Sequence, residues 1–180
     1  MGWVVNRMNN NFVLDYERAN REKFNLFRFV YRYLKHHYVR YLFWGRLNAD
    51  SENGIIHQIA GIRFRGIGRK YGLEMNMKQK GGGIRLIHPY DITVNDMAII
   101  GPRVTLYKGC TIGEIVSGAK RGCPTIGNDV TIYANATLCG NIQIGNDVEI
   151  AAGSFVNFNV PDNSIVIGNP GTIHTRKNVK

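Results

Sequence analysis

The sequence predicts a mainly β protein, a three-sided parallel coil of hexapeptide repeats preceded by an α-helical cap. Two observations support this fold class. Aliphatic residues recur every six positions over residues 94–156, a spacing that fits neither an α-helix nor a simple alternating strand. The basic charge also gathers at one end, since residues 1–73 hold 13 Lys/Arg and 5 Asp/Glu whereas residues 74–180 hold 10 and 8. We therefore expect a basic cap over residues 1–73 and a coil over residues 74–180.

The cap is expected to be largely helical. Apolar residues between Asp15 and Leu47 recur at about 3.6-residue spacing, with Arg and Lys between them. Residues 48–54 read as a polar linker, and Ile55 to Tyr71 continue as a basic amphipathic stretch. This pattern favours packing on the coil, and peripheral contact with an anionic membrane or an acidic glycan is the alternative. No nucleic-acid-binding motif accompanies the charge, so nucleic acid is not expected as a partner.

Ten anchor residues define the coil, and all are Ile, Leu or Val. They are Val94, Ile100, Leu106, Ile112, Ile126, Ile132, Leu138, Ile144, Ile150 and Val156. A small or aliphatic residue stands four positions after each anchor, Val116 among them. Three hexads close one turn of such a coil, and turns stack at about 4.8 Å. The segment before Val94 is expected to add a further turn.

One interruption breaks the repeat. Ile112 and Ile126 are 14 residues apart instead of 12, so residues 114–124 are expected to project from the coil as a loop. A single coil this narrow buries little apolar surface, so we expect its flat faces to pack against those of neighbouring copies in a homotrimer.

Composition excludes other classes. The chain has 44% hydrophobic and 20% charged residues, which is typical of a globular protein, and no apolar run is long enough for a membrane span. The first residues lack the basic and apolar regions of a secretory signal. Three cysteines cannot all pair, and none lies in a C-x-x-C motif, so a reduced, cytoplasmic chain is expected.

Several segments carry a resemblance to a known family. They are Gly72-Leu73-Glu74-Met75, residues 83–88 (GIRLIH), residues 92–95 (ITVN), residues 121–127 (RGCPTIG), residues 166–170 (VIGNP) and, in the cap, residues 15–20 (DYERAN). With the hexapeptide repeat, these segments resemble the left-handed β-helix acyltransferases. The chain is most similar to the serine acetyltransferase branch, and within it to short relatives that act in polysaccharide biosynthesis.

The resemblance implies transfer of an acetyl group from acetyl-CoA to a hydroxyl, without a metal. His88 matches the family's general base, a role that suits a group titrating near neutral pH. Glu74 matches the carboxylate that orients this histidine, although its spacing is one residue short, and Asp91 or Asp96 are rivals. Arg121 and Asp96 fall on the acceptor side. Five small residues match the positions that line CoA between subunits: Gly113, Ala134, Ala152, Gly153 and Gly168.

Three departures bear on the acceptor. Ile87 replaces an Asp that contacts the amino acid in serine acetyltransferases, Gly122-Cys123 replaces a second His, and the N-terminal part is shorter than their helical domain. These departures lead us to expect a saccharide acceptor in capsule or exopolysaccharide synthesis, with serine O-acetylation in cysteine synthesis as the alternative. A zinc hydrolase on the same coil would need three histidines, and residues 74–180 contain only His88 and His174.

Overall fold

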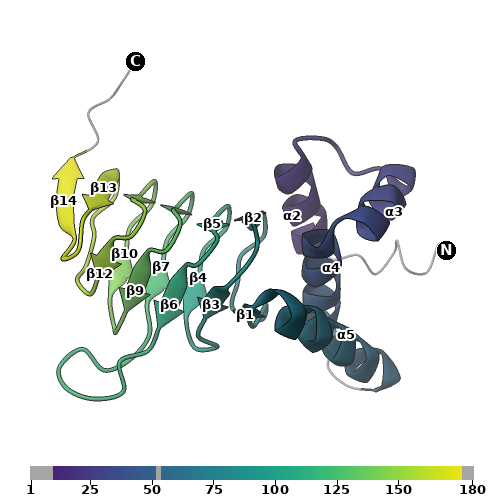
Figure 1. The fold of residues 1–180 in the computed structure, drawn as a ribbon, viewed down its shortest axis with the longest axis horizontal. Helices are drawn as coiled ribbons and strands as arrows, with labels where there is room; N and C mark the ends of the chain where they lie inside the picture. Colours follow the sequence, from purple (N-terminus) through teal and green to yellow (C-terminus); the bar gives the residue numbers. More distant parts are fainter. Residues whose placement is uncertain (1–9, 52–53, 176–180) are drawn as a thin grey trace.

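The computed structural model describes residues 10–51 and 54–175. Four helices lie at one end and short strands stack away from them in successive turns, with the C-terminal strand at the far end (Figure 1). The expected fold class, a left-handed parallel β-helix with an N-terminal helical cap, is confirmed. Within the described ranges, no helix combines the length and apolar character needed to cross a bilayer.

In its described residues, the cap contains α2 (Asn10–Asn20), α3 (Leu26–Lys35), α4 (His37–Asp50) and α5 (Ile55–Tyr71). The segment from Asp15 to Leu47, expected to be helical, therefore contains parts of three helices with two breaks between them. Arg21 adopts a left-handed φ of 55° after α2, and the side chain of Asn25 caps the start of α3 by accepting from Phe27 N and Arg28 N. His36 is extended and separates α3 from α4. The expected linker is also shorter, because α4 continues to Asp50.

A buried ion pair joins the cap to the first turn of the coil. Arg46 of α4 donates from Nε to Asp15 Oδ2 of α2 at 2.8 Å, and the side chains are 3% and 0% exposed. Asp15 Oδ1 also accepts from Ile84 N at 2.8 Å, while Arg46 donates to Lys80 O and Gly81 O of the coil. The cap is thus fastened to the coil by charge-assisted hydrogen bonds as well as by apolar packing.

The coil has three parallel faces. Sheet A contains β1 (Leu73–Met75), β3 (Ile92–Val94), β6 (Thr111–Gly113), β9 (Thr137–Cys139) and β12 (Phe155–Val156). Sheet B contains β4 (Ile99–Ile100), β7 (Thr125–Ile126) and β10 (Gln143–Ile144). Sheet C contains β2 (Arg85–Ile87), β5 (Thr105–Tyr107), β8 (Thr131–Ile132), β11 (Glu149–Ile150), β13 (Ser164–Ile167) and the antiparallel end strand β14 (Thr172–Thr175). The chain passes from C to A to B and back to C, so β1 and β2 supply the extra turn expected before Val94.

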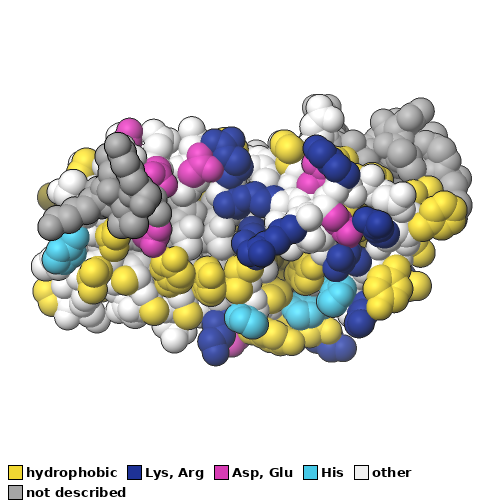
Figure 2. Space-filling view, turned by 90° about the horizontal axis from the view of Figure 1, so that it is seen from above, with side chains coloured by type: hydrophobic (Ala, Val, Ile, Leu, Met, Phe, Trp, Pro, Cys, Tyr) yellow, Lys and Arg dark blue, Asp and Glu magenta, His cyan; other side chains and the backbone are white. Residues whose placement is uncertain are grey.

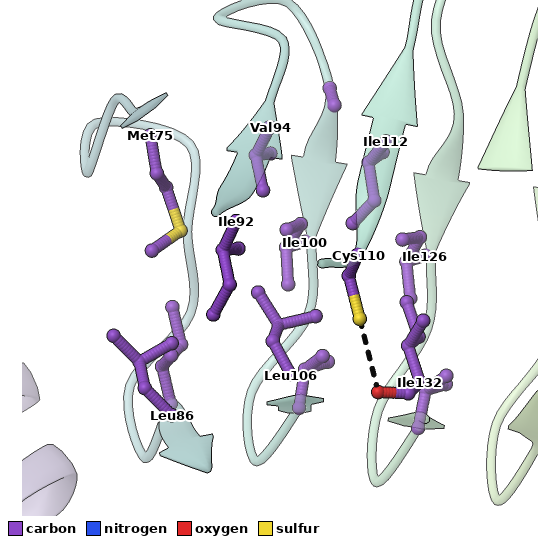
Figure 3. Close-up of a cluster of buried hydrophobic side chains, with 14 of the residues drawn as sticks. Met75, Leu86, Ile92, Val94, Ile100, Leu106, Cys110, Ile112, Ile126 and Ile132 are labelled. Carbon is purple, nitrogen blue, oxygen red and sulfur yellow. Dashed lines mark hydrogen bonds between the residues drawn. The ribbon is translucent and has the colours of Figure 1, made fainter. Parts of the chain in front are cut away.

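The anchors fill the inside of the coil. All ten are buried, and Figure 3 shows the side chains of Val94, Ile100 and Ile112 among others directed into the space between the sheets. Cys110 also lies inside and donates from Sγ to Ile132 O at 3.3 Å. Val116 is an exception, because it is 74% exposed in the projecting loop, and the buried Pro124 stands two residues before Ile126 where an inward residue is required.

The corners between sheets C and A repeat one left-handed turn. Asp91, Gly109, Asn135 and Gly153 occupy this position in successive turns, each with φ between 55° and 71°. Glycine is favoured at Gly109, since its φ is 71° and a Cβ there would lie 2.0 Å from Asn135 Oδ1. These corners therefore share one regular backbone turn.

Candidate active site

His88 lies on a corner that is larger than those below it. In the strand register, Ile87 pairs with Tyr107 and Thr93 pairs with Thr111. Five residues lie between Ile87 and Thr93 along the chain, but only three lie between the equivalent Tyr107 and Thr111 of the next turn. The two additional residues are His88 and Pro89. His88 has a φ of 49°, which is uncommon for a residue with a side chain, and it is exposed. The insertion thus presents an accessible imidazole at the edge between sheets C and A.

The cap holds this enlarged corner in place. The His37 ring, at the start of α4, stacks on Tyr71 with centroids 3.9 Å apart and lies 5.2 Å from the Tyr90 ring. His37 Nε2 is 3.2 Å from Pro89 O, so the tautomer with a proton on Nε2 donates to the inserted turn. Burial lowers the pKa of His37 and favours the neutral ring. Sequence reasoning missed His37, and the eight-residue spacing from Leu86 to Val94 is the signal that could have revealed the insertion.

Glu74 and Asp96 line one hollow near the start of the coil. The hollow, of about 680 Å³, lies between α4, α5 and the first turns of the coil. Its charged lining residues are Arg65, Arg69 and Lys78 as well as the two carboxylates, and none of these five forms a salt bridge in the described part of the chain. The structure shows no hydrogen bond between Glu74 and His88 among the described residues. The hollow therefore offers unpaired charges of both signs.

Asp91, a rival partner of His88, is turned toward the cap. A Cβ on Gly72 would lie 2.3 Å from Asp91 Oδ1, so the carboxylate occupies the space over this glycine. Asp91 N donates to Tyr71 O at 3.1 Å. The geometry gives Asp91 a role in joining α5 to the coil.

Most predicted cofactor positions lie on the same edge as His88. Ala134, Ala152 and Gly153 follow β8 and β11 at successive C–A corners, and Gly153 N donates to Ala134 O at 2.9 Å. Gly168 follows β13 at the same edge. Gly153 has open space where a Cβ would be, so a ligand can approach the backbone there. The structure thus aligns four of the five small residues with His88 along the coil axis.

Gly113, Asp96 and Arg121 lie on the next edge, between sheets A and B. The loop over residues 114–124 begins directly after Gly113, projects from the coil (Figure 1) and closes through Ile115 and Gly122, whose backbone groups pair at 2.9 and 3.0 Å. Arg121 is exposed on this loop, and Lys120 Nζ donates to Asn157 O two turns further on. A single chain therefore does not bring Arg121 and His88 to the same edge.

A buried lysine lies behind Asp96. Lys80 is 3% exposed, and its Nζ donates to Ala98 O at 2.5 Å. Burial lowers its pKa to about 8, while the charge of Asp96 opposes this shift. No group of three or more His, Cys, Asp or Glu side chains suited to a metal ion occurs within residues 10–51 and 54–175.

The chain thus forms a flat-sided left-handed coil with hexad anchors inside and an exposed histidine at an enlarged corner. The family described as "Bacterial transferase hexapeptide (six repeats)" matches residues 123–157. The chain is 37% identical over 100 residues to a serine acetyltransferase of Synechococcus elongatus, which covers 56% of this chain and 41% of that protein. The similarity to the serine acetyltransferase branch is thus confirmed, although the match spans less than half of this relative's length.

Solved structures share this fold. The soybean serine acetyltransferase apoenzyme superposes with a TM-score of 0.74 at 25% identity and covers 91% of this chain and 67% of the soybean chain. A serine acetyltransferase solved in complex with CoA has a TM-score of 0.72 at 22% identity and covers 92% of this chain and 68% of that one, which shows a shared fold.

These comparisons correct the expected acceptor. The prediction of a saccharide acceptor in polysaccharide synthesis was wrong, because the relatives and the structural neighbours named above are serine acetyltransferases. The three departures from that branch are two substitutions around the acceptor and a shorter N-terminal part. They are too few to assign a different acceptor against the similarity of the coil to serine acetyltransferases.

Proposed function

We propose that the protein transfers the acetyl group of acetyl-CoA to the hydroxyl of L-serine. The observation that carries this proposal is the exposed His88 on its two-residue insertion, in a coil that is 37% identical to a serine acetyltransferase. The CoA complex of a structural neighbour supports acetyl-CoA as the donor.

His88 acts as the general base in this proposal. Its imidazole takes the proton of the serine hydroxyl as the oxygen attacks the thioester carbonyl, and the C–S bond breaks to release CoA. The imidazolium then returns its proton to the departing thiolate. Glu74, the carboxylate that the resemblance assigns to this histidine, stabilises the imidazolium by its charge.

The hollow lined by Glu74 and Asp96 supports an amino-acid acceptor. L-Serine carries an ammonium and a carboxylate, and the hollow presents Glu74 and Asp96 together with Arg65, Arg69 and Lys78. Opposite charges on one lining favour a zwitterion over a neutral ligand. This arrangement offers an alternative to the Asp that Ile87 replaces.

We further propose that the active unit is a homotrimer. His88 and Gly153 lie on one edge of the prism, whereas Gly113 and Arg121 lie on the next, so the two groups can face each other only across two copies. A mass of three chains by light scattering is expected. Mixing and reassembling inactive His88→Ala and Arg121→Ala chains should restore about a quarter of the sites, because each site takes one residue from each of two copies. Absence of any recovery in reassembled trimers would refute a shared site.

Release of free CoA thiol with L-serine as acceptor tests the activity, with L-alanine as the control that lacks the hydroxyl. His88→Ala should lower the rate by about 10²–10⁴-fold, the usual contribution of a positioned general base. His174→Ala is the matched control, since His174 is also exposed but lies on β14 at the far end of the coil. Thermal melting and CoA titration show whether the His88→Ala protein remains folded and binds the donor. A folded His88→Ala protein that acetylates serine at the wild-type rate would remove the assignment.

A further inference from the structure

The cap carries an exposed apolar surface that the proposed acetyl transfer does not use. Helix α3 packs inward through Phe29, whose ring lies 5.6 Å from Phe12 and 5.7 Å from Phe43. Its opposite face presents Phe27, Tyr31 and Leu34, which are 86%, 59% and 71% exposed. Their spacing places them on one side of the helix. Three large apolar side chains on one outer helix face mark an interaction surface.

Basic residues continue this surface onto α4 and α5. Arg40 donates from Nη1 to Leu34 O at 2.9 Å, at the end of the apolar face. The same Arg40 lines a hollow of about 520 Å³ with Arg63 and Lys70 of α5, together with the exposed Ile62. All the charged residues that line this hollow are cations. In Figure 2, hydrophobic, Lys/Arg and His side chains lie interleaved over the helical end of the molecule.

We propose that this surface, formed by Phe27, Tyr31, Leu34, Arg40, Arg63 and Lys70, docks on an anionic phospholipid membrane. A short helix that presents aromatic and aliphatic side chains beside Lys and Arg suits the boundary between headgroups and acyl chains. The three cations of the hollow face the lipid phosphates, and the apolar side chains of α3 insert between the acyl chains.

Charge favours a lipid over a second copy of this chain. A symmetric contact between two such surfaces would bring Arg40, Arg63 and Lys70 of one copy close to the same cations of the other. An anionic bilayer instead neutralises all three and accepts the apolar residues. The chain would then attach by its cap, with α3 parallel to the membrane plane.

Co-sedimentation of the full chain with vesicles tests the proposal, with phosphatidylcholine containing phosphatidylglycerol compared against phosphatidylcholine alone. We expect binding to the anionic vesicles that weakens with salt. Arg63→Gln/Lys70→Gln should bind about 25-fold more weakly, at about fivefold for each cation removed. Arg65→Gln/Lys78→Gln removes the same charge around the other hollow, so it should bind within about twofold of the wild type.

Phe27→Ser/Leu34→Ser tests the apolar contribution and should also release the chain from the vesicles. Both side chains are exposed, so the fold should persist, and circular dichroism checks this. Equal binding to both kinds of vesicle, or equal losses in the two charge variants, would refute a specific docking surface. A smaller mass of Phe27→Ser/Leu34→Ser in light scattering would assign the surface to contacts between copies and would also overturn the proposal.

Discussion

Among the contacts between the cap and the coil, we expect mutation of the buried ion pair Asp15–Arg46 to cause the largest loss of stability. Asp15→Ala removes the acceptor of three hydrogen bonds, two from Arg46 and one from Ile84 N. It leaves the guanidinium of Arg46, 3% exposed, without its counter-charge. Breaking such a buried pair costs about 3–5 kcal/mol. For a chain of this length that corresponds to a fall in Tm of about 6–20 °C, since each kcal/mol shifts Tm by about 2–4 °C.

The exposed pair between Arg103 and Asp129 is the matched control. It also has two hydrogen bonds, at 2.7 and 2.5 Å, but its side chains are 52% and 44% exposed. Solvent screens such a pair, so Asp129→Ala should cost about 1 kcal/mol or less. Thermal melts followed by far-ultraviolet circular dichroism measure both variants. Asp15→Ala/Arg46→Met should recover part of the loss, because it removes the uncompensated charge. Equal Tm values for Asp15→Ala and Asp129→Ala would refute the reasoning.

Two further predictions concern Lys80 and His37. Burial lowers the pKa of Lys80 from 10.5 to about 8, so between these pH values the folded chain binds fewer protons than the unfolded chain. The free energy of unfolding should therefore rise by up to about 3 kcal/mol as the pH increases through this range. Urea titrations at several pH values should show that Lys80→Met lacks this increase. His37→Phe keeps a ring on Tyr71 but loses the hydrogen bond to Pro89 O, so kcat should fall by up to about 100-fold with an unchanged KM for acetyl-CoA. His37→Gln can still donate a hydrogen bond and should recover part of the rate. Equal rates in the two variants would contradict a positioning role for His37.

The sequence predicted the coil well because its inward positions are set by local chemistry. Each hexad needs one aliphatic anchor such as Ile132 or Leu138, and a period of six admits few alternative folds. The cap was less predictable. Its apolar spacing continues through Arg21 and His36, and only the backbone conformation at these residues separates the helices. The match between Asp15 and Arg46, 31 residues apart, depends on tertiary packing that a pattern of single residues does not show.

The candidate site lies where the hexapeptide repeat of the coil is interrupted. Anchors and their partner positions occupy the interior, and the regular corners are short left-handed turns of Gly, Asn or Asp, so a larger side chain such as His88 is found where the repeat is interrupted. The coil has two such interruptions in its described residues: the pair His88-Pro89 between sheets C and A, and the loop over residues 114–124 between sheets A and B. They lie on neighbouring edges of one prism, and only the packing of prisms side by side can bring them together. Trimer formation and catalysis are thus linked in our proposal by geometry, because the same repeat that makes the prism too thin to stand alone also separates the two halves of its site.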